Sequence, residues 1–145
     1  MNTGRIIGAG LLAGLVLNIG EYVLNGIILA PQWEAAMAEQ GLEELSGGDI
    51  GVLVFFTFLT GIALVWLYAA MRSRFGAGFK TAVIAGFFVW LFVGIWPFIW
   101  NSLVPLWPSN LTLVALVWTL FEYPIAAAAG AWMYKERPLA AVTTA

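Results

Sequence analysis

Two glutamates are the residues of this sequence whose type and position could do chemistry. Glu21 and Glu122 each interrupt a long apolar run that contains no Lys or Arg. An ionisable side chain in hydrocarbon costs at least about 2.5–3.5 kcal/mol, so it is a candidate functional group by default. Two ionised carboxylates would also repel each other in a medium of low dielectric. We therefore expect at least one of them to hold its proton at neutral pH.

Neutral polar residues accompany the first glutamate on one face of its helix. At 100° per residue, Asn18 and Asn25 share with Glu21 a sector of about 80° around the helix axis, which also contains Gly10 and Gly14. Small residues let a second helix approach closely, and the polar groups can then hydrogen-bond across the contact. The pattern predicts that this face packs against another helix.

Further polar faces occur in the run around Glu122 and in the second apolar run, where threonines, a tyrosine and glycines share a face. The predicted proton- or ion-binding residues are Glu21, Glu122, Asn18, Asn25, Thr119, Tyr123 and Thr57, and the predicted helix-packing residues are Gly10, Gly14, Gly61 and Gly130.

Two interpretations of these residues remain open at this point. In the functional one, the carboxylates with amide and hydroxyl oxygens bind a proton or cation in a transporter or sensor, and Trp90, Trp96 and Tyr123 supply aromatic walls for cation–π contacts. In the structural one, protonated Glu21 and Glu122 only join helices by hydrogen bonds.

Composition limits the alternatives. Hydrophobic residues make up 62% of the 145 residues even without the 16 glycines, whereas about 45–50% with glycine counted is typical of soluble domains. Six Lys and Arg and a net charge of −2 argue against nucleic-acid binding. The absence of His and Cys removes the imidazole and thiolate groups of common catalytic and metal sites. We expect no enzymatic activity, no metal and no cofactor.

Four apolar runs are long enough to cross a bilayer, which requires about 20 residues. They cover about 6–29, 51–71, 82–100 and 111–134. The sequence thus predicts an all-α fold, a four-helix transmembrane antiparallel bundle in a single domain of residues 1–137, with a flexible tail at 138–145.

The distribution of basic residues predicts how the protein is oriented in the membrane. All basic residues fall on one side of the four predicted spans, namely Arg5, Arg72, Arg74, Lys80, Lys135 and Arg137. The positive-inside rule makes that side cytoplasmic. We expect a multi-pass protein of the bacterial cytoplasmic (inner) membrane with both termini in the cytoplasm and the lipid bilayer as its first partner.

The loop between the first two spans predicts a short helix on the outer membrane surface. Pro31 can begin a helix and Gly41 can end one. Between them Trp33, Ala36 and Met37 recur at helical spacing. A solvated acidic loop is the alternative.

A repeated tripeptide ends the second and fourth spans, Trp66–Tyr68 and Trp132–Tyr134. It is compatible with two helical hairpins related by a repeat. The simpler interpretation, anchoring at the membrane interface, is favoured because the first and third spans share little sequence.

The layout resembles small four-helix bacterial inner-membrane proteins of unassigned activity. The segments that carry this resemblance are Asn18-Ile19-Gly20-Glu21-Tyr22, Pro31-Gln32-Trp33 and Trp132-Met133-Tyr134-Lys135-Glu136. It is also similar to small multidrug transporters, which have four short helices and a glutamate in the first. An acidic outer loop and a second intramembrane glutamate distinguish this chain from them.

The second expected function is a non-catalytic accessory or assembly subunit. In that case the glycine- and asparagine-rich face of the first span would dock a larger membrane partner. Either function is compatible with a homo-oligomer or a larger membrane-protein complex.

Overall fold

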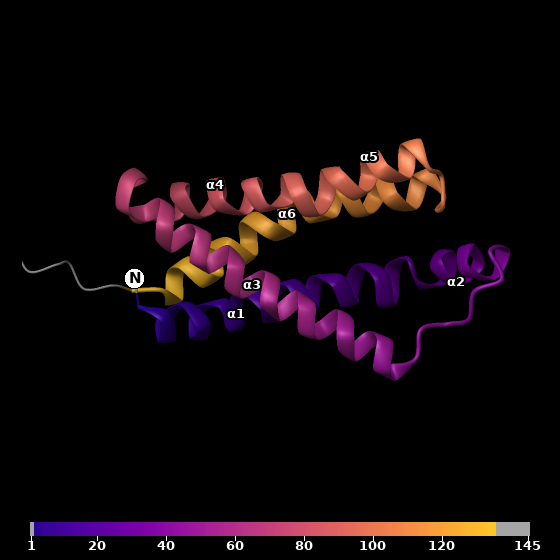
Figure 1. The fold of residues 1–145 in the computed structure, drawn as a ribbon, viewed down its shortest axis with the longest axis horizontal. Helices are drawn as coiled ribbons and strands as arrows, with labels where there is room; N and C mark the ends of the chain where they lie inside the picture. The colour runs from indigo at the N-terminus through magenta and orange to yellow at the C-terminus, as the bar shows by residue number, and fades with distance from the viewer. Residues whose placement is uncertain (1, 136–145) are drawn as a thin grey trace, which may run out of the picture.

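The computed structural model describes residues 2–135, and these residues form helices and connecting turns without a strand (Figure 1). The α-helices are α1 (Thr3–Glu21), α2 (Ala30–Glu39), α3 (Gly47–Phe75), α4 (Phe79–Trp90), α5 (Trp96–Leu103) and α6 (Ser109–Met133). Two π-helical segments, η1 (Tyr22–Ile28) and η2 (Leu91–Ile95), continue α1 and connect α4 to α5.

Four helical stretches in the described part of the chain are long and apolar enough to cross a membrane. They are Thr3–Ile28, Gly47–Phe75, Phe79–Leu103 and Ser109–Met133. Short turns join the second to the third and the third to the fourth, and a longer segment that contains α2 joins the first to the second, so that the four form an antiparallel bundle (Figure 1). The prediction of an all-helical, four-helix bundle is therefore confirmed, and the chain has the architecture of a polytopic membrane protein.

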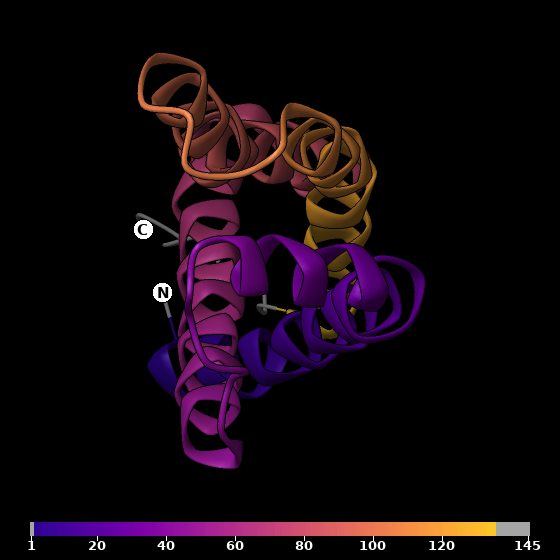
Figure 2. The same ribbon diagram turned by 90° about the vertical axis from the view of Figure 1, so that its right-hand side faces the viewer.

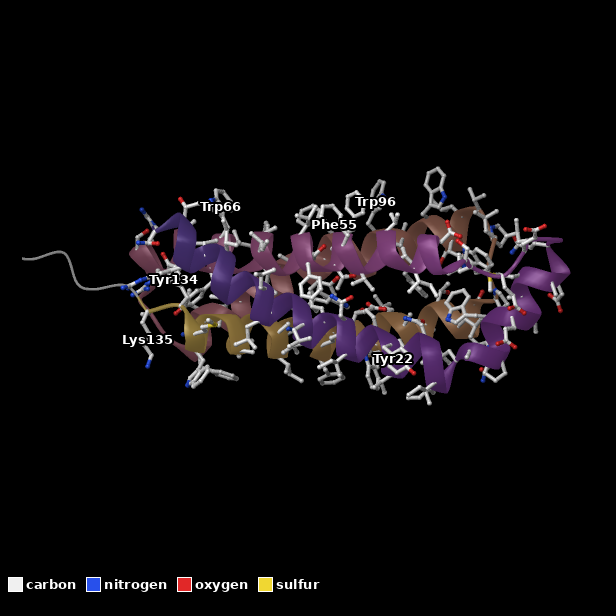
Figure 3. The ribbon with its side chains drawn as sticks, turned by 90° about the horizontal axis from the view of Figure 1, so that it is seen from below. Tyr22, Phe55, Trp66, Trp96, Tyr134 and Lys135 are labelled. Carbon is white, nitrogen blue, oxygen red and sulfur yellow. The ribbon has the colours of Figure 1, made fainter. Side chains whose placement is uncertain are left out.

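The interior of the bundle is built from small residues and its surface from large apolar ones. Ala13, Ala82 and Ala126 are fully buried, whereas Phe92 and Trp132 are mostly exposed. Figure 3 likewise shows the labelled aromatic side chains of the middle of the bundle projecting away from it. Close packing of small residues is typical of helices that associate in lipid, where burying large apolar groups gains little.

Glycines create the closest helix contacts. A Cβ atom at Gly10 would lie 2.5 Å from Cα of Ile62, and one at Gly14 would lie 2.8 Å from Cα of Phe58. A Cβ at Gly61 would in turn overlap the backbone of Gly14. Because backbone atoms cannot move aside, only glycine permits this approach of α1 and α3. The predicted packing residues thus lie at this helix crossing.

The second hairpin has a comparable contact. A Cβ atom at Gly86 of α4 would lie 2.6 Å from Cα of Pro124 in α6. The fourth predicted packing glycine, Gly130, lies on α6 against Val65 of α3 and Ala13 of α1. Backbones therefore approach closely both within the hairpins and between them.

The two ends of the bundle differ in charge. The chain order brings Arg5, Arg72, Arg74, Lys80 and Lys135 to the end that carries the N-terminus, which we call the basic end (Figure 1). The opposite, acidic end carries Glu34, Glu39, Glu43, Glu44 and Asp49. No Lys or Arg of the described chain lies at the acidic end.

The helix predicted in the first loop is present as α2. Gly41 follows it with a φ of 68°, a left-handed conformation that suits glycine at a helix end. Views from two sides show α2 lying across the acidic end, transverse to the long helices (Figures 1 and 2). Ala36 is buried there with Leu24 and Leu111, and Trp33 packs against this cluster.

In the two repeated tripeptides, the tryptophans and the tyrosines occupy different environments. Trp66 and Trp132 are exposed, but Tyr68 and Tyr134 are buried and meet edge to face with ring centroids 6.3 Å apart. The tyrosines belong to the core at the basic end rather than to its surface. The tail predicted at 138–145 lies outside the described residues.

Candidate functional site

The two glutamates lie on helices that pack against each other, Glu21 at the end of α1 and Glu122 in the middle of α6. Glu122 occupies the space beside Gly20, because a Cβ atom at Gly20 would overlap Oε1 of Glu122. Glu21 is the next residue in α1, so the two carboxyl groups are close enough to interact electrostatically. The predicted pairing of the two acids is therefore a feature of the fold.

Glu122 is buried with little compensation, since the backbone N–H of Glu21 is the one group that interacts favourably with its carboxylate. The residue is 6% exposed, and neither carboxylate oxygen has a hydrogen-bond partner among residues 2–135. Burying a polar group without a partner costs several kcal/mol, and a charged one costs more. A carboxyl group in this position lowers stability unless it is protonated or neutralised.

Glu21 belongs to a short chain of hydrogen bonds. The side-chain amide of Asn25 donates to Oε2 of Glu21 at 2.6 Å, and the indole of Trp33 donates to Oδ1 of Asn25 at 2.9 Å. The chain links the glutamate near the centre of the bundle to α2 at the acidic end. Asn25 therefore holds both Glu21 and α2 in position.

A cavity of about 280 Å³ reaches from the glutamate to the acidic end. Glu21 and Thr119 line it near the middle of the helices, and Trp33, Asn101 and Trp107 line it near the acidic end. Glu21 is the one carboxylate among its lining residues, and no Lys or Arg contributes to its wall. The cavity thus gives one carboxylate a route toward the acidic side.

One π-helical segment, η2, lines this cavity, and the other, η1, begins beside it. The segment η1 begins directly after Glu21 and contains Asn25, while η2 contributes Val93 and Gly94 to the opposite wall. Pro97, which also lines the cavity, lacks the N–H that would bond the carbonyl of Val93, so a regular α-helical ladder cannot continue there. Such π-helical turns often occur at functional sites.

Of the seven predicted site residues, two line the cavity, Glu122 and Asn25 lie beside Glu21 without lining it, and the other three lie elsewhere. Asn18 donates to the carbonyl of Gly14 at 2.8 Å, and Thr57 donates to the carbonyl of Leu53 at 2.9 Å, each within its own helix. Tyr123 is buried in the main apolar core. The cavity therefore brings together Glu21 and Thr119, and Asn25 holds Glu21 by a hydrogen bond without lining the cavity itself.

The aromatic wall consists of residues other than those expected from the sequence. Trp96 is 65% exposed on the surface, and Trp90 is buried with its indole donating to the carbonyl of Leu116 at 3.2 Å. Trp33 and Trp107 line the cavity instead, edge to face with ring centroids 5.5 Å apart. Their separation of 74 positions in the chain gave no signal that they meet.

Asn101 is a further residue that sequence reasoning did not place in the site. Its amide donates to the carbonyl of Trp107 at 3.0 Å, and its Oδ1 accepts from the N–H of Leu106 and of Trp107. These bonds fix the α5–α6 loop at the mouth of the cavity. The sequence offered one signal for Asn101, since it is the one amide side chain in the third apolar run and lies at the end of that run.

The site contains two carboxylates, those of Glu21 and Glu122. Across the described residues no group of three or more acidic, His or Cys side chains could hold a metal ion. Comparison of the chain with protein-family models, curated proteins and solved structures gave no match.

Proposed function

We propose that the chain is a small inner-membrane protein that binds and releases a proton or cation at Glu21 and Glu122, as a transporter or sensor does. The observation that carries this proposal is the buried carboxyl group of Glu122, which has no hydrogen-bond partner in the described chain. Such a group is tolerated in lipid when it is protonated or when a cation neutralises it. Either state makes it a binding site for a positive charge.

The cavity supports exchange with one side of the membrane. It connects Glu21 to the acidic end, and no residue of the half toward the basic end lines it. A site open to one side is one of the two states that alternating access requires. The five acidic residues at this end would raise the local concentration of cations.

The proposed orientation follows the basic residues. The basic end would face the cytoplasm of a bacterium, with both termini inside and the cavity open to the outside. A cysteine introduced at Ser46 should then react in intact cells with a thiol reagent that cannot cross membranes. Labelling of that position from the cytoplasmic side alone would reverse the orientation.

Proton transport can be measured in liposomes that contain the purified protein. A membrane potential set by potassium and valinomycin should drive protons across faster than in protein-free liposomes. Glu122→Gln should reduce the rate to that of protein-free liposomes, because the amide cannot exchange a proton. Glu39→Gln, a change at an exposed acid of α2, is the matched control and should leave the rate unchanged.

Two results would contradict proton transport through Glu122. One is an equal rate for the native protein and Glu122→Gln. The other is a rate for the native protein no higher than that of protein-free liposomes. Stoichiometric co-purification with an unrelated membrane protein in mild detergent would then favour the accessory-subunit function.

A further inference from the structure

The walls of the cavity are too apolar for an inorganic ion to lose its water there. Besides Glu21 and three neutral polar residues, the cavity is lined by apolar ones such as Val93, Pro97 and Leu116. The neutral polar residues are Asn101, Thr112 and Thr119, and each hydrogen-bonds backbone carbonyls of its own segment. Ions such as Ca²⁺ need six to eight oxygen ligands, and Mg²⁺ needs six in strict geometry. One carboxylate with two hydroxyl groups and one amide, in a wall that is otherwise apolar, does not provide such a shell. The lining instead suits a ligand that is itself mostly apolar.

The charge of the cavity selects a cation. Glu21 contributes a carboxylate whose Oε2 accepts from Asn25, and no second donor to Glu21 is found in residues 2–135. Without Lys or Arg in the wall, an anion would meet repulsion and no compensating partner. A single ammonium group would complete the hydrogen bonding of Glu21 and neutralise it.

The aromatic residues add a second attraction for the same ligand. Trp33 and Trp107 lie at the acidic end of the cavity, and Phe98 lies deeper in the wall. Aromatic rings attract organic ammonium groups through cation–π contacts and pack against apolar ligand bodies. A volume of about 280 Å³ is near the lower limit of about 300–1,000 Å³ for small-molecule pockets. It accommodates a compact ligand with one ring.

We infer that this cavity binds a small organic monocation, a primary amine with an apolar or aromatic body. Its ammonium group contacts Glu21, and its body lies between the aromatic residues and the apolar wall of η2 and α6. This inference rests on the proposed cation-binding function and names the chemical class of the ligand. Glu122 does not line the cavity, and in this inference it binds the proton while Glu21 binds the amine.

Titration calorimetry on the purified full-length protein tests the inference with phenethylammonium as the probe. The neutral 2-phenylethanol and the anionic phenylacetate have the same ring and serve as matched ligands. The ammonium ion should bind at millimolar concentrations or below, and the other two at least about tenfold more weakly, because a buried carboxylate discriminates strongly by charge. This comparison uses only the native protein, so it does not depend on a variant that folds.

A variant then assigns the binding to the cavity. Glu21→Gln should weaken phenethylammonium binding at least about tenfold, whereas Glu39→Gln should leave it unchanged. Equal binding of the three ligands, absence of ammonium binding, or full binding by a folded Glu21→Gln variant would each overturn the inference. Proton transport without amine binding would overturn this inference alone, since the proposed function would stand.

Discussion

At the scale of single residues, the molecule buries a carboxyl group that no side chain of residues 2–135 hydrogen-bonds, and the backbone N–H of Glu21 is the one group that offsets part of the cost. Glu122 is buried against Gly20, and no hydrogen bond satisfies either oxygen in residues 2–135. A residue that served only to join helices would be expected to have a partner on the neighbouring helix. The geometry therefore favours the functional interpretation of Glu122 over the structural one.

This interpretation predicts that stability and function respond in opposite directions at Glu122. Glu122→Met replaces the carboxyl group with an apolar side chain of similar length. It should raise the free energy of unfolding by about 1–3 kcal/mol, because an unsatisfied polar group is removed from the interior. Proton transport should be lost in the same variant.

Thermal unfolding of the detergent-solubilised protein measures the change, and Glu122→Gln is the control of nearly equal shape. A lower melting temperature for Glu122→Met than for Glu122→Gln would show that the carboxyl group joins helices after all.

The sequence predicted the acids of the site better than its aromatic walls. Glu21 and Glu122 stand out because each is a charge in an apolar run, a signal that needs no tertiary information. Trp33 and Trp107 meet only because α2 and the α5–α6 loop both cover the acidic end. Such contacts depend on the paths of loops, which apolar periodicity does not encode.

At the scale of the elements, hydropathy was sufficient to predict the four long helices but not their internal irregularities. Each run of about 20 apolar residues must hydrogen-bond internally in lipid, which leaves the helix as the available structure. The π-helical segments η1 and η2 involve shifts of single hydrogen bonds inside these runs. Pro97 was a visible cause for η2, whereas no residue type by itself indicates η1.

The close contact of α1 and α3 predicts that two glycines of α3 differ in their tolerance of alanine. Gly61→Ala should destabilise the protein by about 1–3 kcal/mol, because the new methyl group would overlap the backbone of α1. Gly51→Ala is the control, since a Cβ atom there meets nothing within 4 Å. It should be neutral or stabilising, because alanine favours a helix over glycine by about 1 kcal/mol.

Thermal unfolding of the two variants side by side measures this difference. Equal melting temperatures for Gly61→Ala and Gly51→Ala would mean that α1 and α3 do not cross at Gly61.

At the scale of the whole molecule, the bundle is asymmetric along its long axis. The half toward the basic end contains glycine and alanine contacts and the paired rings of Tyr68 and Tyr134, and a separate pocket lies there between α1 and α3. The half toward the acidic end contains the cavity and is covered in part by α2. Because Glu21 lines the cavity toward the acidic end and not the other pocket, a charge bound there would exchange with the acidic side.

The central claim is that a protonated carboxyl group lies inside this bundle at neutral pH. Infrared difference spectroscopy of the protein in lipid bilayers detects the C=O stretch of such a group directly. Between about pH 5 and about pH 9 exposed glutamates are ionised, so a band from a protonated carboxyl group reports a shielded one. The account predicts this band at neutral pH in the native protein and its loss in Glu122→Gln. Spectra with ionised carboxylates alone over the whole range, in the absence of a bound cation, would contradict it.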